Sequence, residues 1–440
     1  MTDAAFAFTL VSMKEVLVMN EKCDVVIVGT GAAGLFSALT LPEDVNIHMV
    51  TKTKVDESDS YLAQGGISVL LDKEDYEEYY EDTMKAGHFE NKKNAVELMI
   101  KSSKEVIELL IEYGVDFEKD KEGNLVFTKE GAHSKARILF HEDETGREIT
   151  STLLKRVKER DNITIHEYTT MIDVIAKDNV CGGIVVVDKN RELAVIEAKD
   201  VILACGGIGG LYKNSTNFPH LTGDAIGIAI KHNVDVENLD YVQIHPTTLY
   251  TKNPGRRFLI SESVRGEGAV LLDKYGNRFT DELQPRDVVT AAIREQMRKD
   301  GTDYVLEDMR PLGKQTILHH FPNIYERCKQ EGYDVLHDPI PVVPAQHYHM
   351  GGVKVDLNSE SSMKGLYVVG EASCNGVHGR NRLASNSLLE ALVFAKRAAE
   401  NVTKREDKGL DNYVVDFEEY KDLDEVFDDY RTSTLKKINK

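Results

Sequence analysis

Tryptophan is absent from this chain of 440 residues, and basic side chains are outnumbered by acidic ones. The 54 Lys and Arg residues against 74 Asp and Glu residues give a formal net charge of -20, which argues against nucleic acid or an anionic membrane as the main partner. Long hydrophobic runs are also lacking, because no stretch approaches the ~18 apolar residues of a membrane span. The remaining composition is that of an ordinary globular protein.

Paired cysteines are lacking as well, and no secretion signal is predicted. The five cysteines are scattered without a Cys-x-x-Cys spacing, so neither a disulfide framework nor a zinc site is predicted, and a reduced, cytoplasmic compartment fits best. The apolar run 4–11 follows Asp3, has no basic segment before it and meets no clear small-residue cleavage site. We therefore interpret residues 1–20 as an N-terminal extension.

The stretch 24–39 carries the signal around which the chain is organised. Residues 25–28 form a short, β-branched run that is typical of a buried parallel strand. Gly29, Gly31 and Gly34 then give the G-x-G-x-x-G spacing, which makes a tight turn and lets backbone approach a pyrophosphate at a helix N-terminus. A dinucleotide site is predicted, against the alternative of a glycine-rich turn without a ligand.

The second predicted strand, 45–50, lacks the acid that usually ends it in an NAD site. It ends in Thr-Lys-Thr-Lys, which counts against a plain NAD site. The ribose or adenine is then held another way, by Lys52 or by Asp56 and Glu57 just beyond. A second strand-to-glycine turn at 201–210 indicates that both ends of a long cofactor meet one sheet.

The length predicts more than one domain, since a single core rarely serves so long a chain. We predict an α/β fold: a Rossmann-like cofactor domain with an inserted α+β capping domain and a short helical C-terminal tail. The predicted bounds are 21–232 and 351–405 for the two parts of the cofactor domain, 233–350 for the capping domain and 406–440 for the tail.

Periodicity and turn residues predict the individual elements. Helices are expected at 74–87 and at 91–113, the second ending at Gly114, and further helices begin near residue 222 and at residue 379. Short strands are expected at 163–167, 171–176, 183–187, 194–198, 201–204 and 365–371.

Histidine and arginine side chains are grouped in the inserted segment and just after it. They are His245, Arg265, Arg286, His347 and Arg382. Cations beside a dinucleotide indicate an anionic substrate, and a dicarboxylate could use two Arg anchors worth roughly 1.5–3 kcal/mol per hydrogen bond. The alternative is a set of surface salt bridges.

Two further polar groups leave alternatives open. The spacing of His347 and His349 could suit a metal, but no carboxylate or Cys cluster completes the set, so no metal is predicted. The loop 129–137 offers Glu130, His133 and Arg137 as site residues, with a solvated loop as the alternative.

A series of stretches resembles the flavoprotein subunits of the succinate dehydrogenase and fumarate reductase family, and within it the members that oxidise L-aspartate most closely. The matching stretches occur in the family's order, at 29–34, 63–66, 130–134, 204–207, 222–224, 243–246, 261–268, 285–287, 347–352 and 379–388.

The resemblance implies that the cofactor domain is an FAD-binding domain. In the membrane-bound relatives a His before Ala-Gln-Gly-Gly carries the flavin covalently, and residues 58–62 contain no His, so the FAD is expected to be non-covalent. The implied FAD-binding residues are Thr30, Gly31, Ala32, Ala33, Lys52, Asp59, Ser60, Tyr61, Leu62, Ala63, Gln64, Gly65, Gly66, Thr170, Met171, Asp224, Glu371, Ser387 and Leu388.

The same resemblance implies roles at the substrate. Arg286 would be the catalytic acid/base, although an Arg is a poor base in water because its pKa exceeds 12. Glu130 would orient the substrate through its amino group. The implied carboxylate anchors are His245, Ser261, His347 and Arg382.

Oxidation of L-aspartate to iminoaspartate is the activity that this resemblance implies. Dioxygen or fumarate would be the electron acceptor, and the product would feed quinolinate and NAD synthesis through a transient contact with quinolinate synthase. The nearest alternative is a soluble fumarate reductase or succinate dehydrogenase-type flavoprotein. An electron-carrier module is disfavoured, because a carrier needs no dicarboxylate site.

Overall fold

The structure, a computed structural model, describes residues 20–253, 255–404 and 413–439. The predicted N-terminal extension lies outside these residues except for Asn20, and so do residues 405–412, where the predicted tail begins.

A seven-stranded sheet forms the centre of the molecule, in the order β5-β2-β1-β8-β7-β6, with β15 also paired to β8. The strands β5, β2, β1, β8 and β15 run parallel to one another. The strand β7 is antiparallel to both of its neighbours, β8 and β6. Their bounds are β1 Asn20–Val28, β2 Ile47–Thr51, β5 Ile163–Glu167, β6 Thr170–Lys177, β7 Val180–Val187, β8 Leu193–Leu203 and β15 Leu366–Val368.

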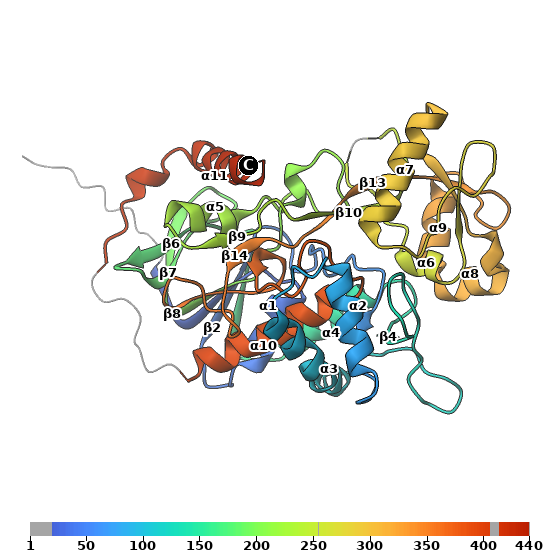
Figure 1. Ribbon diagram of the computed structural model, residues 1–440. Helices are drawn as coiled ribbons and strands as arrows, with labels where there is room; N and C mark the ends of the chain where they lie inside the picture. The colour runs from blue at the N-terminus through green and yellow to red at the C-terminus, as the bar shows by residue number, and fades with distance from the viewer. Residues whose placement is uncertain (1–19, 254, 405–412, 440) are drawn as a thin grey trace, which may run out of the picture.

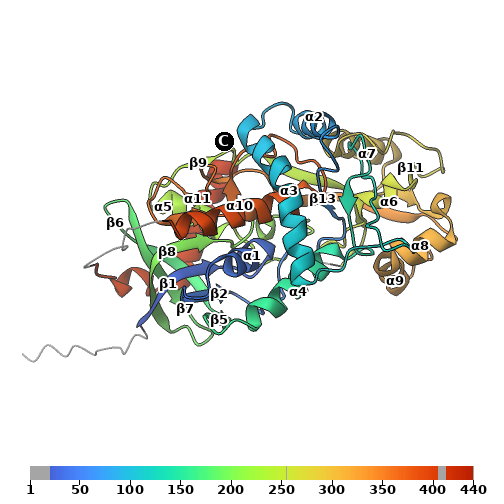
Figure 2. The ribbon, with the colours of Figure 1, turned by 90° about the horizontal axis from the view of Figure 1, so that it is seen from below.

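Helices cover both faces of this sheet (Figure 1). Figure 2 looks onto one face, where α1, α3, α4 and α10 lie, and on the opposite face α5 and α11 pack against each other. The bounds are α1 Ala32–Thr40, α2 Tyr76–Ala86, α3 Lys93–Tyr113, α4 Thr145–Lys158, α5 Asp224–Lys231, α10 Asn386–Val402 and α11 Leu423–Ile438. This arrangement buries both faces of the parallel strands, which explains their continuous apolar runs.

A four-stranded antiparallel sheet, β10-β13-β12-β11, lies at one end of the molecule with α6 to α9 (Figure 1). It has its own hydrophobic cluster, which includes Leu271, Ile293, Val305 and Ile324. The bounds are β10 Val242–Leu249, α6 Glu262–Gly266, β11 Val270–Leu272, α7 Arg286–Asp300, β12 Val305–Asp308, α8 Lys314–His320, α9 Pro322–Gln330 and β13 Ile340–His349. The inserted capping unit is therefore α+β, as predicted.

Two small sheets and four short 3-10 turns complete the described part of the chain. The remaining bounds are β3 Ile67–Ser68, β4 Ile138–Leu139, η1 Gly209–Leu211, β9 Val236–Glu237, η2 Arg310–Leu312, β14 Gly352–Lys354, η3 Gly370–Ala372, β16 Ser373–Cys374 and η4 Phe417–Tyr420. The strand β9 pairs with β14, which lies in the second part of the FAD-binding domain. The chain therefore makes this pairing before it enters the capping sheet.

Most predicted elements are confirmed, and two predictions are wrong. Helix α3 ends at Gly114, which adopts φ 103, as expected of a C-terminal glycine. The two strands expected at 194–198 and 201–204 are the single strand β8, because its ladder with β1 continues through Asp200, which pairs with Val25. The helix expected from residue 379 begins only at Asn386, because Ser385 before it has φ 59, outside the helical region.

Candidate active site

A cavity of about 1360 Å³, its open mouth included, lies at the carboxyl ends of the parallel strands. The turn after β1 forms one wall, and steric limits explain its glycines. A Cβ on Gly29 would lie 2.2 Å from the Ala204 carbonyl oxygen, and a Cβ on Gly34 would lie 2.1 Å from that of Gly29. Close packing of the two glycine turns therefore leaves the start of α1 facing the cavity.

Many of the residues expected to bind FAD line this cavity. They are Thr30, Gly31, Ala33, Lys52, Asp59, Ser60, Leu62, Ala63, Met171, Asp224, Glu371, Ser387 and Leu388. The others are not in its lining: Ala32, Tyr61, Gln64, Gly65, Gly66 and Thr170. A role in binding FAD stays a prediction for both groups.

Lys52 has an acidic partner that the second strand itself does not supply. Its Nζ forms an ion pair with Asp224 at the start of α5 and donates to the His220 carbonyl, 3.1 Å away. Glu57 also lines the cavity, whereas Asp56 does not. The acid at this end of the site therefore comes from α5 and from Glu57, both beyond the end of the second strand.

Two half-buried acidic residues, Asp59 and Glu371, line the cavity. Burial raises the pKa of Asp59 to about 7 and that of Glu371 to about 8. Asp59 Oδ1 accepts from the Phe218 amide at 2.9 Å, but its Oδ2 is buried without a partner. An orphaned carboxyl oxygen in a cavity calls for a polar ligand, so the lining fits a dinucleotide that reaches from the α1 turn past these groups.

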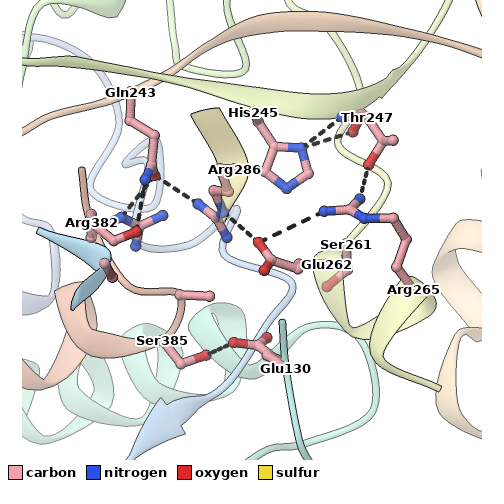
Figure 3. Close-up of polar contacts among 12 residues, drawn as sticks. Glu130, Gln243, His245, Thr247, Ser261, Glu262, Arg265, Arg286, Arg382 and Ser385 are labelled. Carbon is pink, nitrogen blue, oxygen red and sulfur yellow. Dashed lines mark hydrogen bonds and ion pairs between the residues drawn. The ribbon is translucent and has the colours of Figure 1, made fainter. Parts of the chain in front are cut away.

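Arginine and histidine side chains gather at the other end of the cavity (Figure 3). His347 and Arg382 line it, and Gln243 lies behind them. The side-chain oxygen of Gln243 accepts from Arg286 Nη1 at 2.8 Å and from Arg382 Nε at 3.3 Å. One neutral amide therefore fixes two guanidinium groups, and Arg382 also stacks 4.5 Å from the centre of the Tyr348 ring.

Glu262 is the acidic partner of this group (Figure 3). Arg286 Nε donates to Glu262, and Arg265 Nη2 lies 3.8 Å from the same oxygen. Burial acts to raise the pKa of Glu262, but Arg286 and Arg265 outweigh it and lower this pKa below its usual value. The Arg286 guanidinium thus has the Glu262 carboxylate on one edge and Gln243 on another.

Both histidines of the cluster are neutral. Burial first, and then Arg286, lowers the pKa of His245 and of His347 well below the usual value. His245 Nε2 is buried with no partner, and its ring meets that of His347 at 70° with 5.0 Å between centres. His347 Nδ1 lies 2.7 Å from Thr216 Oγ1. A neutral ring can still donate one N–H to an anionic ligand.

Glu130 lies below this cluster rather than in the cavity lining. It accepts a hydrogen bond from the Ser263 hydroxyl at 2.9 Å. It also accepts one from the Ser385 hydroxyl (Figure 3). Burial, followed by the nearby Glu262, raises the pKa of Glu130. A Cβ on Gly65 would lie 2.7 Å from Glu130 Oε1, which explains a glycine at that position.

Three other candidates have structural partners. Ser261 caps α6, because its hydroxyl accepts from the Ser263 amide at 3.3 Å. Arg137 is fully buried in a two-pronged pair with Asp75, so the alternative of a solvated loop is wrong at this residue. His349 Nε2 lies 3.0 Å from the Leu239 carbonyl oxygen, so His349 and His347 contact different groups.

Sequence reasoning missed Gln243 and Glu262 as site residues. Both occur within stretches that resemble the family, 243–246 and 261–268, but their neutral or acidic side chains were not expected among cationic anchors. Each of these two side chains lies between two arginines. This position is visible in the folded structure and not in the sequence.

The comparisons with known proteins agree with this geometry. Residues 24–388 match the FAD binding domain family. The chain is 51% identical over 385 residues to an L-aspartate oxidase of Clostridium acetobutylicum, covering 87% of this chain and 88% of that one. It is 49% identical over 409 residues to an L-aspartate oxidase of Clostridium perfringens, covering 92% of each.

The chain belongs to the L-aspartate oxidase family. This family is part of the succinate dehydrogenase and fumarate reductase flavoproteins, and its cofactor is FAD. A solved structure of a quinol-fumarate reductase with menaquinol molecules superposes with a TM-score of 0.83 at 31% identity, over 88% of this chain and 71% of that one. No helix in the described part of this chain is long and apolar enough to cross a membrane.

Proposed function

We propose that this L-aspartate oxidase family member oxidises L-aspartate to iminoaspartate, the first step of quinolinate and NAD synthesis. One observation carries the proposal: Arg286, Arg382, His245 and His347 meet at one end of the cavity whose other end is a dinucleotide turn. FAD bound there would accept the two electrons that leave the substrate as a hydride from the Cα–H bond, while a proton leaves the nitrogen and the Cα–N bond becomes a double bond.

Arg382 and the two histidines bind and orient the carboxylates of the substrate. Arg382 is held by Gln243, by the Ser387 hydroxyl and by the Tyr348 ring, so its guanidinium has little freedom to lose on binding. Ser261 acts as a further anchor only if its capping hydroxyl also reaches the substrate.

Arg286 is the proposed acid/base. Its Nε donates to Glu262 and its Nη1 to Gln243, which holds the side chain in one orientation inside a site from which water is largely excluded. Glu262 then stabilises the protonated guanidinium between turnovers. A proton transferred to or from Arg286 would pass at the edge of the guanidinium that Glu262 and Gln243 leave free.

Glu130 is proposed to distinguish L-aspartate from succinate. The two molecules share their carboxylates, so the cationic anchors cannot separate them, and the difference is an ammonium group on Cα. Glu130 is the buried carboxyl below the anchors that is bound by hydroxyl groups only, those of Ser263 and Ser385. Pairing with an ammonium would lower the raised pKa of Glu130 and recover charge-assisted hydrogen bonding.

Several finer points stay part of the proposal. The flavin is held without a covalent bond, the acceptor is dioxygen or fumarate, and a transient contact with quinolinate synthase receives the product. A cytoplasmic location rests on the five cysteines, which are all free.

The test is anaerobic reduction of the FAD-loaded protein, followed by air. L-aspartate should bleach the flavin and air should restore its colour, while succinate should leave it unchanged. Bleaching by succinate and not by L-aspartate would favour the alternative, a fumarate reductase or succinate dehydrogenase-type enzyme.

Glu130→Gln sharpens the same test. The variant should lose most of its kcat/KM for L-aspartate, because the ammonium of the substrate is left unpaired in a buried site. Fumarate reduction by the same preparation should survive far better, because fumarate has no ammonium group. An equal loss of both activities would mean that Glu130 supports the fold or the flavin and does not recognise the amino group.

A further inference from the structure

One cluster of metal-ligating side chains lies on the central sheet, outside the cavity. Glu21 on β1, His48 on β2 and His166 on β5 place one ligand atom each within 4.8 Å of the others. None of the three lines the cavity. No other trio of His, Cys, Asp or Glu side chains in residues 20–253, 255–404 and 413–439 meets this spacing.

The sheet itself sets the positions of the two imidazoles. His48 pairs with Val26 across the β1–β2 ladder, and His166 pairs with Val50 across the β2–β5 ladder. Val50 lies two residues after His48, so both rings project from the same face of neighbouring strands. Such positions are fixed by backbone hydrogen bonds and not by flexible loops.

The ligand atoms have the separations of a coordination triangle. Glu21 Oε2 lies 2.9 Å from His48 Nδ1 and 3.3 Å from His166 Nε2, and the two nitrogens are 3.2 Å apart. Zinc takes imidazole nitrogen and carboxylate oxygen at about 2.0–2.2 Å in a tetrahedron, whose edges are then about 3.3–3.6 Å. Three atoms at 2.9–3.3 Å need only a small outward movement to bind one ion.

Hydrogen bonding does not account for this arrangement. The two imidazoles form a hydrogen bond with each other, whereas the buried Glu21 Oε2 lies at ion-pair distance from both rings, 2.9 Å and 3.3 Å, without a hydrogen bond to either. A carboxylate oxygen aimed at two nitrogens without a hydrogen bond to either is the geometry of ligands around a shared centre.

Access and charge also suit a divalent cation. The side chains of Glu21, His48 and His166 are 29%, 11% and 24% exposed, so a water molecule can reach a fourth position. One carboxylate and two imidazoles form a set of intermediate softness, which favours zinc and other late first-row metals over calcium or magnesium.

We propose that Glu21, His48 and His166 form a binding site for one first-row divalent metal ion, Zn²⁺ in the first instance, with water as the fourth ligand. The site is separate from the oxidation chemistry. Because it joins β1, β2 and β5, a bound ion would link three strands of the central sheet and stabilise the folded protein.

The experiment is a titration of the EDTA-treated, FAD-loaded full chain with Co²⁺, followed by Zn²⁺. One Co²⁺ per chain should give the visible absorption of a tetrahedral site, and one Zn²⁺ should displace it. Zn²⁺ should also raise the Tm of the wild-type protein.

His166→Asn and Glu21→Gln should each weaken Zn²⁺ binding by about 100-fold or more, since even the loss of an outer-shell partner costs 10–100-fold. Flavin content and Tm without metal serve as fold controls. His337→Asn is the matched control, because His337 lies 2.8 Å from Asp334 in an exposed pair without a third ligand. No saturable binding by the wild type, or equal binding by the wild type and both site variants, would overturn the proposal.

Discussion

At the residue scale, neutral and acidic side chains organise the cationic site. Gln243 accepts from two arginines that are 43 and 139 residues away in the sequence, and Glu262 neutralises one of them. The guanidinium groups would otherwise repel one another in a buried space. The partners therefore explain how the anchors stay together before an anionic substrate arrives.

Gln243→Leu is expected to lower kcat/KM for L-aspartate by about 10- to 100-fold, because a hydrogen bond to a charged group contributes about 1.5–3 kcal/mol. Most of the change should appear in KM, since both arginines lose their orientation. Steady-state kinetics on FAD-loaded protein measure it. Gln296→Leu is the control, because the Gln296 side chain donates its hydrogen bond to Asp300 on the same helix, α7. A KM within twofold of wild type for Gln243→Leu would contradict the prediction.

Glu307 on β12 gives a pH-dependent prediction. It is fully buried, neither carboxyl oxygen has a partner, and burial raises its pKa from 4.5 to about 7. Between these values the folded protein keeps a proton that the unfolded chain has lost, so this residue makes stability fall as the pH rises from about 4.5 to about 7.

Glu307→Gln should therefore raise the free energy of unfolding at pH 8 by about 1–3 kcal/mol and change it little at pH 5. Denaturant titration at both pH values measures the difference. The exposed Glu122→Gln variant is the control. An equal effect of Glu307→Gln at both pH values would contradict the raised pKa of Glu307.

At the element scale, one contact between the capping unit and the FAD-binding domain lies at the start of a helix, α9. The residue before α9, Phe321, provides no side-chain cap. Asp143, from the segment after β4, takes this role: it accepts from the backbone of Asn323 at 3.2 Å and of Ile324 at 2.8 Å. A cap that comes from another domain joins two units that are otherwise separate in their cores.

Asp143→Ala should cost about 1–2 kcal/mol of stability, as for other helix caps. It should also raise KM, because the capping unit carries Arg286 and His245 against the cavity. Thermal unfolding and kinetics together test this. Asp422→Ala removes a cap within its own helix, α11, and should lower the Tm without a change in KM. Equal KM effects of the two variants would rule out a docking role for Asp143.

At the scale of the whole molecule, the cavity joins segments from distant parts of the chain. Its lining includes the turn after β1, residues near Asp224, the capping-sheet residue His347, and Leu388 on the returning helix α10. A ligand that contacts all of them binds only the folded chain and therefore stabilises it.

FAD is therefore expected to raise the Tm in a concentration-dependent way, with a gain of about 2.7 kcal/mol at 100 times its Kd. A non-covalent flavin should be removed by acid precipitation and washing, so that the yellow colour is lost. The apoprotein obtained in this way is used for the titration. Adenosine monophosphate, which reaches only one end of the cavity, is the control and should have a smaller effect. A Tm that does not depend on FAD would contradict this account of the cavity.

The sequence by itself determined the features that follow from local rules. The spacing of Gly29, Gly31 and Gly34 identified the turn after the first strand, and the structure gives the reason, because a Cβ on Gly29 would lie 2.2 Å from the Ala204 carbonyl oxygen. Periodicity predicted α3, because an amphipathic stripe and Gly114 specify a helix and its end. The chain's pattern predicted the α/β fold and the inserted domain, and the family resemblance implied FAD, before any contact was known.

Only the tertiary structure decided the contacts between distant residues. The pairing of Lys52 with Asp224, the bridging role of Gln243 and the meeting of His48 with His166 each join segments more than 100 residues apart. Local patterns carry no information about such pairs, because the same side chain is a surface residue or a site residue according to what packs against it. The single strand β8 has the same cause: its ladder with β1 overrides a polar interruption in the sequence.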